Sequence, residues 1–366
     1  MSSSAPFEFS SLTYTLDDVI AETEDTAANT DDPALRTAAL DLDKLVESPE
    51  LPSIFALACL FNVPLFLTNE TGTMVALKRY HPPTPGLRDR ESSMARIHKL
   101  LGQELRAHCF PALREHENIC KLLFLGWEDT SLLPAAALEL ATFGTLDDAL
   151  QDMRSYSSAL TKAHITFDIV AGLNAIHQCG LVHGDVKPGN IIICEHPSRL
   201  VIAKISDLNG VAPSESYGKK QSFFWSPLWQ APEALQRENN IDWQLCDVYS
   251  LAMVLTTIWT TKGWIPPGGC FLDPLLEYDY KDDAYMQRIE AAKLLPDRFD
   301  GSMVKTACQS LEGANIPPNL PMKDIISLGL SAIASRRPPL TEIMSRYLSK
   351  FALECGRTMQ LASSDR

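Results

Sequence analysis

The stretch of sequence that decides the fold is His183-Gly-Asp-Val-Lys-Pro-Gly-Asn190. It follows a segment with apolar residues at helical spacing and leads into the apolar run Ile191-Ile-Ile193, which has the pattern of a buried strand. A bare His-x-Asp would be interpreted as an ordinary polar turn between a helix and a strand. With Lys, Pro and Asn also in register, the stretch instead indicates a loop that carries chemistry.

This octapeptide resembles the catalytic loop of the protein kinase family, H-R-D-L-K-P-x-N. The resemblance implies that Asp185 accepts or orients the proton of an attacking hydroxyl, while Asn190 holds a metal ion that bridges the phosphates of ATP. Lys187 would steady the transferred phosphoryl group, and a lysine here resembles serine/threonine rather than tyrosine kinases. ATP and Mg²⁺ are therefore the expected cofactors, and a protein hydroxyl is the expected acceptor.

Upstream, Val75-Ala-Leu-Lys78 resembles the family's V-A-I-K strand. The resemblance implies that Lys78 binds the α- and β-phosphates and pairs with a glutamate on the next helix. Glu104 is the preferred partner, because it precedes His116-Glu-Asn-Ile119, which resembles the family's H-P-N-I turn. Glu91 is the alternative partner.

Downstream, Ser206-Asp-Leu-Asn-Gly210 begins 21 residues after Asp185 and resembles the D-F-G segment, with Asp207 as a metal ligand. Leu208 stands in place of the phenylalanine and Asn209 in place of the glycine. Because asparagine tolerates left-handed backbone better than most residues, we expect the turn to survive at Asn209.

Three further segments resemble scaffold elements of the family. Ser226-Pro-Leu-Trp-Gln-Ala-Pro-Glu233 resembles T-P-x-Y-x-A-P-E, with Ser226 expected to contact the catalytic Asp and Lys. Asp247-Val-Tyr-Ser-Leu resembles D-V-W-S-L, whose Asp binds the backbone of the catalytic loop. Arg337 of Arg337-Pro resembles the late arginine that pairs with the A-P-E glutamate, here Glu233.

The resemblance also implies a site for the adenine ring. The hinge backbone at Glu139 and Ala141 would bind the ring edge, and Leu138 would guard the rear of the pocket. Ala76 and Ile192 would enclose the ring from its two faces. The same two residues could equally be plain core residues.

Six ordered motifs cover about residues 51–352 and imply an α+β, bilobal, protein kinase-like fold. The expected parts are a β-rich N-lobe at 51–138, a hinge at 139–145, a helical C-lobe at 146–352 and a C-terminal tail at 353–366. Hydrophobic patterning predicts the elements. Strands are predicted at 74–77, 119–125 and 135–140, and helices at 90–108, 161–179 and 248–259. The long loop between Lys78 and Glu104 resembles a branch often seen in fungi.

Two positions depart from the family pattern. No glycine precedes Gly72, so the glycine-rich loop that covers the phosphates is missing from the apolar window 51–64, where Ser53 or Ala58 could lie near the nucleotide. Gly184 replaces the arginine that binds a phosphorylated activation loop. We therefore expect phosphorylation or alanine substitution at four activation-loop positions to change the phosphoryl-transfer rate little. These positions are Ser214, Ser216, Tyr217 and Ser222.

Three functions remain open at this point. The chain could be an active serine/threonine protein kinase, or a pseudokinase that acts as a scaffold, as the absent glycine loop suggests. The His-Gly-Asp and Pro-Gly-Asn pairs also resemble small-molecule phosphotransferases. That third class is disfavoured, because its members usually lack a lysine in the position of Lys187 and lack the A-P-E, D-V-x-S and late R-P segments.

Charge and cysteine content limit the binding partners and the cellular location that the chain can have. The formal charge is −14, of which −10 lies in residues 1–50, so we expect an acidic, disordered tail that could bind a basic partner. A pI near 5.0 without a Lys/Arg cluster disfavours nucleic-acid binding. Nine cysteines without a C-x-x-C pair suggest reduced thiols in an intracellular protein, cytoplasmic or nuclear. The apolar run 54–67 is too short for a membrane span.

Overall fold

A computed structural model describes residues 13–15, 65–68, 74–79, 90–127, 134–151, 158–215, 217, 226–236, 240–260 and 302–354. The chain divides into two compact units, each of which is considered separately. The first comprises the chain up to Ala141 together with Asp207–Asn209. The second comprises Thr142–Ser206 and the chain from Gly210 onward. The division falls within the segment 139–145 that we predicted as the hinge.

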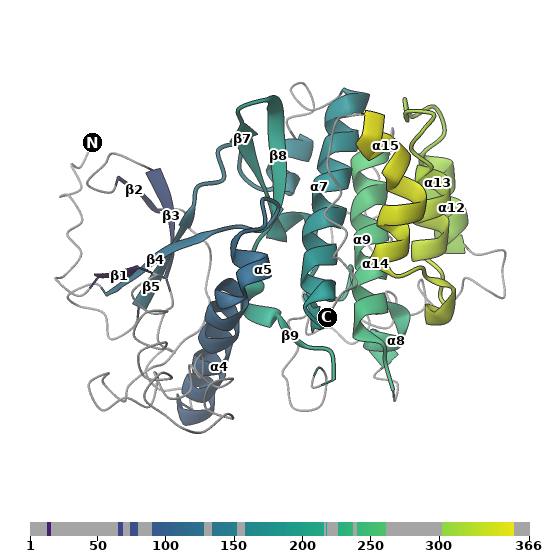
Figure 1. Cartoon of the computed structure of the whole chain (residues 1–366). Helices are drawn as coiled ribbons and strands as arrows, with labels where there is room; N and C mark the ends of the chain where they lie inside the picture. The colour runs from purple at the N-terminus through teal and green to yellow at the C-terminus, as the bar shows by residue number, and fades with distance from the viewer. Residues whose placement is uncertain are drawn as a thin grey trace. The chain divides into compact units, whose positions relative to one another are not determined.

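The first unit is built on a five-stranded antiparallel sheet with the strand order β1-β4-β5-β3-β2 (Figure 1). The strands are β1 Thr13–Thr15, β2 Leu65–Thr68, β3 Met74–Arg79, β4 Leu122–Trp127 and β5 Pro134–Glu139. The predicted strands at 74–77 and 135–140 are therefore found, and the predicted strand at 119–125 begins three residues later, at Leu122. In the central strands, Val75, Leu77, Ala135 and Ala137 form a buried apolar cluster. Their alternation places Ala76 and Lys78 on the opposite face of β3.

Thr13–Thr15 lie within the segment 1–50, for which we expected a disordered tail. These three residues form β1, which pairs antiparallel with β4 at the edge of the sheet. The β-branched and aromatic residues Thr-Tyr-Thr suit a strand, and the open edge of β4 supplies their backbone partners. The remainder of the tail, the window 51–64 with Ser53 and Ala58, and the C-terminal residues 355–366 lie outside the described residues.

The helices of the first unit follow β3 in the chain. Helix α4 spans Arg90–Cys109, close to the predicted 90–108, and the short helix α5 spans Pro111–Arg114. One face of α4 is buried, including Leu101, Glu104, Leu105 and His108. A glutamate and a histidine one turn apart on a buried face are unusual, and both belong to the site described below.

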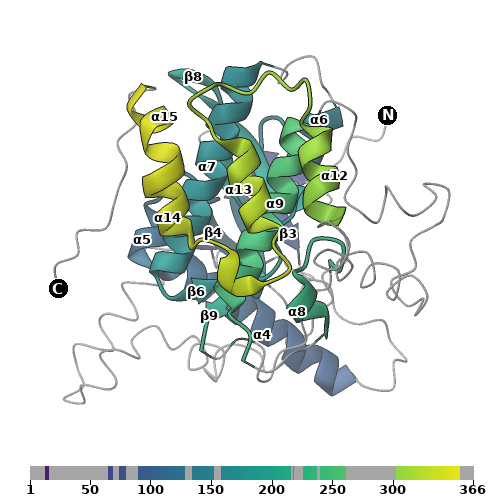
Figure 2. The same cartoon turned by 90° about the vertical axis from the view of Figure 1, so that its right-hand side faces the viewer.

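The second unit is organised around two helices that are buried on nearly all sides. Helix α7 spans Ala159–Gln178 and α9 spans Trp243–Trp259, and both views show them side by side (Figures 1 and 2). Their N-termini are capped by Ser158 and Asp242, whose side chains accept backbone N–H groups of the first turn. The two helices are joined where Trp259 Nε1 donates to Thr166 Oγ1 at 3.0 Å.

Shorter elements surround these helices. The hairpin of β7 Ile191–His196 and β8 Arg199–Ile205 lies beside α7, and β6 Leu181–Val182 pairs with β9 Ala212–Pro213. Helix α13 Met322–Gly329 lies along α9, and α12 Ser302–Ser310 packs against α13. The helices α14 Leu340–Glu342, the π-helical η4 Ile343–Leu348 and α15 Ser349–Glu354 continue one another (Figure 2). The remaining elements are α6 Leu146–Gln151, η1 Pro188–Asn190, η2 Leu208–Gly210, α8 Pro232–Gln236 and η3 Ala334–Arg336.

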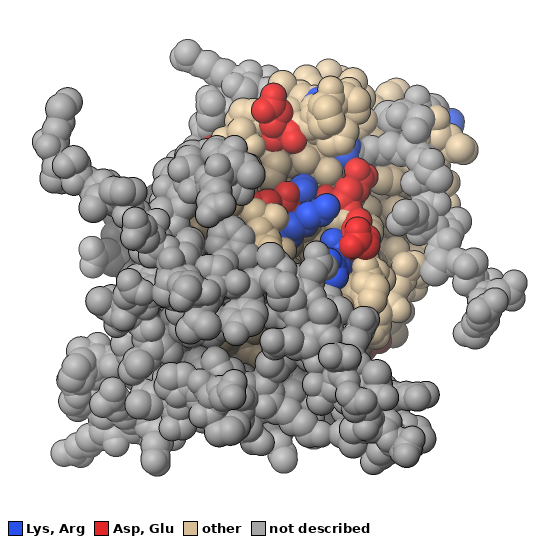
Figure 3. All heavy atoms as spheres, turned by 60° about the vertical axis from the view of Figure 1, so that its left-hand side comes forward, with Lys and Arg blue, Asp and Glu red and all other residues tan. Residues whose placement is uncertain are grey.

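The described surface carries charges of both signs. On the face in Figure 3, Lys and Arg side chains lie next to Asp and Glu side chains, and the described residues form no extended basic area there. Among the described helices, none is long and apolar enough to cross a membrane.

Candidate active site

The first unit carries a buried cluster of one amine and two carboxylates. Lys78 Nζ, on β3, lies 2.8 and 2.9 Å from the two carboxylate oxygens of Glu104 on α4, and 2.7 Å from Asp207 Oδ1. The side chains of Lys78 and Glu104 are only 8% and 2% exposed, whereas that of Asp207 is 23% exposed. One positive charge facing two negative charges leaves an excess of negative charge at the more exposed carboxylate, which favours binding of a cation.

Of the two predicted partners of Lys78, the structure places Glu104 in contact with it. The side chain of Glu91, the alternative, lies outside the described residues. Helical spacing explains the choice, because Leu101, Glu104, Leu105 and His108 share the buried face of α4. Burial and the nearby Lys78 ammonium lower the pKa of His108 to about 3, so the imidazole is neutral beside the ion pair.

The turn at Asp207 differs from our expectation. Asp207 itself has a left-handed backbone with φ of +58°, and among the described residues other than glycine only Asn240 shares this feature. Asn209, where we expected the left-handed turn, lies in the 3₁₀ turn η2 and is buried. The left-handed region costs an aspartate energy, and such strain is typical of functional sites.

The second unit carries the catalytic-loop residues, gathered around one carboxylate. Asp185 Oδ2 accepts hydrogen bonds from Lys187 Nζ at 2.7 Å and from Asn190 Nδ2 at 3.0 Å. Asn190 Nδ2 also donates to the Asp185 carbonyl oxygen at 2.8 Å. Lys187 Nζ donates in addition to Ser226 Oγ at 2.9 Å. Lys187 thus contacts both Asp185 and Ser226, and Asn190 contacts Asp185; the hydrogen bond described here for Ser226 is the one to Lys187.

One oxygen of Asp185 is left without a partner. The carboxylate is 7% exposed, and Oδ1 has no hydrogen-bond partner among the described residues. A buried carboxylate oxygen without a donor is costly, so it calls for a ligand that supplies a proton or a positive charge. Because both described bonds of the Asn190 amide use Nδ2, its carbonyl oxygen is the atom suited to bind a metal ion.

His183 holds the loop from within. Its Nδ1 accepts the backbone N–H of Asp185 at 3.2 Å, so Nε2 carries the proton and donates to the Ser206 carbonyl oxygen at 3.2 Å. The imidazole thus joins the catalytic loop to the end of the β7–β8 hairpin. Ser206 directly precedes Asp207 in the chain.

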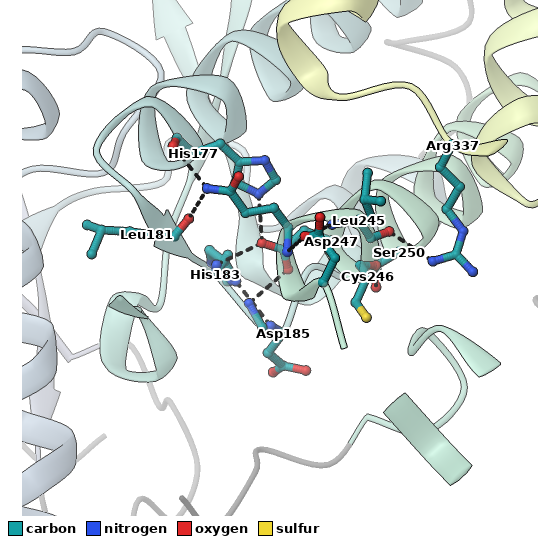
Figure 4. Close-up of polar contacts among 12 residues, drawn as sticks. His177, Leu181, His183, Asp185, Leu245, Cys246, Asp247, Ser250 and Arg337 are labelled. Atoms are coloured by element: carbon teal, nitrogen blue, oxygen red, sulfur yellow. Dashed lines mark hydrogen bonds and ion pairs between the residues drawn. The ribbon is translucent and has the colours of Figure 1, made fainter. Parts of the chain in front are cut away.

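Asp247, on α9, anchors the backbone of the same loop (Figure 4). Its Oδ2 accepts the N–H of His183 at 2.8 Å, and its Oδ1 accepts the N–H of Gly184 at 2.9 Å. His177 Nε2, on α7, lies 2.9 Å from Oδ2. A single buried carboxylate therefore fixes the two residues before Asp185 to both central helices.

A second buried ion pair lies at the other side of α9. The guanidinium of Arg337 binds both carboxylate oxygens of Glu233, with Nη2 at 2.9 Å from Oε2. Arg337 also donates to the carbonyl oxygens of Leu245 at 3.0 Å and Ser331 at 2.8 Å (Figure 4 shows the first). Cys246 Sγ lies 3.4 Å from Glu233 Oε1, and burial together with this carboxylate raises the pKa of the thiol well above its ordinary value.

The residues predicted to surround adenine lie in two places. In the first unit, Ala76 of β3 is paired with Leu138 of β5, and Glu139 ends β5 with its backbone N–H bound to Lys121 O at 3.0 Å. Ala141 is the last residue of that unit before Asp207. In the second unit, Ile192 of β7 is 9% exposed and forms a β-bridge with Thr145.

Two buried polar residues were not predicted from the sequence. Asp168 of α7 is fully buried, and it accepts the Ala203 N–H and an Arg199 N–H of β8, both at 3.0 Å. A lone acid on an otherwise apolar helix was the signal that could have revealed it. Tyr217 packs against the catalytic loop at Gly184. The sequence feature that could have revealed this contact was Gly184, which we interpreted only as the loss of an arginine.

Comparison with known proteins agrees with this geometry. Residues 62–268 match the family model of the protein kinase domain. The chain belongs to the protein kinase family. The α+β kinase-like fold predicted from the sequence is thereby confirmed.

Several relatives of this kinase domain bear the names of protein kinases. The chain is 27% identical over 236 residues, 64% of its length, to the mitogen-activated protein kinase kinase kinase YODA of Arabidopsis thaliana. It is 28% identical over 174 residues, 47% of its length, to the glycogen synthase kinase-3 homolog YGK3 of Saccharomyces cerevisiae. These matches span 24% and 41% of the two relatives, so the chain covers well under half of either protein.

Proposed function

We propose that this kinase domain transfers the γ-phosphoryl group of ATP to serine or threonine hydroxyls of a protein substrate. The observation that carries the proposal is the state of Asp185, whose Oδ2 is fixed by Lys187 and Asn190 while Oδ1 has no partner among the described residues. In the reaction, Asp185 accepts the proton of the substrate hydroxyl as its oxygen bonds to the γ-phosphorus and ADP leaves.

The other residues bind and orient. Lys78 binds the α- and β-phosphates, and Glu104 holds its ammonium in place. Lys187 faces both Asp185 and Ser226, so it stabilises negative charge where the phosphoryl group is transferred. The adenine ring is assigned to Ala76, Leu138 and Ile192, with hydrogen bonds from the backbone at Glu139 and Ala141.

The donor set fits Mg²⁺. A carboxylate at Asp207 and an amide oxygen at Asn190 are hard oxygen ligands, and phosphate oxygens complete the shell in this class of enzyme. The described residues contain no cluster of three or more His, Cys, Asp and Glu suited to hold an ion by themselves, which suits a metal that arrives with the nucleotide. When bound, Mg²⁺ supplies the positive charge that the phosphates require.

The test uses the full chain and two readouts. Thermal melting with ATP, with and without Mg²⁺, measures nucleotide binding, and radiolabelled ATP with phosphoamino-acid analysis of the chain and a peptide library measures transfer. We expect Mg²⁺-dependent stabilisation and phosphoserine or phosphothreonine. The Asp185→Asn variant is expected to lower transfer at least about 100-fold, because it removes the proton acceptor. Asp324→Asn, an exposed acid on α13, is the matched control and is expected to leave the rate unchanged.

Each alternative has its own outcome. Binding of Mg²⁺ and ATP without transfer that depends on Asp185 would support the pseudokinase, which the absent glycine-rich loop favours. Transfer to a small-molecule alcohol but not to peptides would support a small-molecule phosphotransferase. The reduced thiols and the protein kinase family also support an intracellular location, and the acidic residues 1–50 remain our proposed contact for a basic partner.

A further inference from the structure

The phenol of Tyr217 occupies a space beside Gly184 that is open only because glycine has no side chain. Gly184 has a φ of +79°, a conformation that side chains rarely adopt. A Cβ atom built on Gly184 would overlap the Tyr217 hydroxyl oxygen and lie 2.5 Å from Cζ. The phenol therefore fills the space into which the side chain of residue 184 would project. In most kinases that residue is the arginine that binds a phosphorylated activation loop.

Tyr217 is part of the core rather than of the surface. Its side chain is 6% exposed and packs with Val182 of β6 and Ala212 of β9. Its ring lies 5.0 Å from that of Trp243, the first residue of α9. The phenol is therefore buried among elements on both sides of the catalytic loop.

The backbone before Tyr217 is bound to the residues that lead into the catalytic loop. Strand β9 pairs with β6, which leads directly into His183. Beyond the pair, Ser214 N donates to Gly180 O at 3.0 Å, and Tyr217 N donates to Pro213 O at 3.0 Å. This turn reverses the chain and brings the phenol back onto Gly184. Ala212–Ser214 are thus held at Gly180–Val182, just before the loop, and Tyr217 lies against the loop itself at Gly184.

No charge of the kind that attracts phosphate is used in this contact. Burial and the carboxylates of Asp247 and Asp185 raise the pKa of the Tyr217 hydroxyl above its ordinary value, so the phenol is neutral at any physiological pH. A phosphate group at this place would face the same two carboxylates without an arginine to bind it. The packing and the shape of the phenol are the parts of this contact from which we argue.

We propose that Tyr217 is a positioning residue that fastens the start of the activation segment to the catalytic loop without phosphorylation. It does so by filling the space that Gly184 leaves open. The inference rests on the proposed kinase function and extends it, because it assigns the ordering of the activation segment to the Tyr217 side chain rather than to a phosphate group. It also changes our expectation that alanine at Tyr217 would be silent, since that expectation considered only the arginine missing at position 184 and not the packing of the tyrosine.

The kinetic test compares variants that remove the ring, the hydroxyl or the space. Tyr217→Ala is expected to lower kcat for a peptide substrate at least about tenfold, while the KM for ATP changes less than about threefold. Tyr217→Phe keeps the ring and is expected to restore most of the rate. Tyr347→Ala removes a half-buried tyrosine from η4 and is the control for simple loss of a ring. Wild type treated with a protein phosphatase is expected to keep its rate.

Gly184→Ala supplies a second route to the same state. Its added methyl group expels the phenol and also strains the left-handed backbone at residue 184, so Gly184→Ala should lose at least as much rate as Tyr217→Ala. The double variant should be no slower than Gly184→Ala, because the phenol is already displaced in that variant. Fully additive losses would show that the two positions act separately and would overturn the proposal. Loss of activity on phosphatase treatment would overturn it as well.

Hydrogen exchange tests the contact without any activity. In Tyr217→Ala, the amides of Gly184, Ser214 and residue 217 are expected to exchange at least about tenfold faster than in wild type. The amide of Trp259, the last residue of α9, whose side chain is fully buried, is the internal reference. Unchanged exchange would refute the fastening whether or not the wild type transfers phosphate. Faster exchange in a chain that transfers no phosphate would keep the contact and refute the kinase function alone.

Discussion

Replacing Arg337 by alanine tests the buried ion pair on which the helical unit depends. Arg337 is 3% exposed and binds both oxygens of Glu233, which is 7% exposed. The substitution leaves the Glu233 carboxylate with only the weak Cys246 thiol among these partners, and it removes the donors to the carbonyl oxygens of Leu245 and Ser331. We therefore expect a large loss of stability.

The magnitude follows from burial. Removing one member of a buried ion pair costs about 3–5 kcal/mol, because the other charge stays buried and unpaired. The carbonyl oxygens of Leu245 and Ser331 also lose their donors, but water can enter the space left by the arginine and bind them. The total loss of stability is therefore about 4 kcal/mol. At roughly 2–4 °C per kcal/mol, the melting temperature should fall by about 8–16 °C.

The control is an arginine with the same contact distance at the surface. Arg346 Nη1 lies 2.9 Å from Glu342 Oε1, but its side chain is 68% exposed. Arg346→Ala should leave the melting temperature unchanged within error, since exposed pairs contribute little. Calorimetry and urea unfolding measure both variants. Equal, small shifts in melting temperature for Arg337→Ala and Arg346→Ala would refute the reasoning. So would a Glu233→Gln/Arg337→Leu double variant that loses more stability than the sum of the losses of Glu233→Gln and Arg337→Leu measured alone.

Three further outcomes are expected. The free energy of unfolding should fall by about 2 kcal/mol between pH 7 and pH 5, because His108 is neutral in the folded chain but regains its ordinary pKa near 6.5 and binds a proton on unfolding. Urea unfolding at the two pH values measures this change, and the His108→Phe variant should lack it. Asp247→Asn places an amide against the N–H groups of His183 and Gly184, so kcat should fall at least about tenfold while Mg²⁺-dependent thermal stabilisation by ATP persists. Lys78→Met should abolish that stabilisation, a result that isothermal titration with ATP would check independently.

Motif spacing predicted contacts between residues that are far apart in the chain. Glu104 was placed at Lys78, and Arg337 at Glu233, because the residue types in family order indicated which charges must be paired. Hydrophobic periodicity placed α4 and α7 within two residues of their observed ends. It missed the first five residues of α9, because Gln244 and Asp247 interrupt the apolar pattern and the capping role of Asp242 was not considered.

Other features depend on three-dimensional fit and could not be predicted locally. The left-handed residue of the turn 207–210 is Asp207, although Asn209 has the better propensity, so the surrounding structure overrides the local preference. Strand β1 forms because the edge of β4 is available, which a polar, acidic segment does not reveal. The phenol of Tyr217 occupies space that exists only because residue 184 lacks a side chain.

The thiol of Cys246 gives the helical unit a built-in chemical reporter. It lies buried beside Glu233 in its protonated, unreactive form, so a thiol reagent can modify it only when the ion pair opens. Cys179, at the end of α7, is half-exposed and serves as the reference thiol. Because cleaved peptides separate the two positions by mass, their labelling ratio over time measures how often this part of the kinase opens while the chain remains folded.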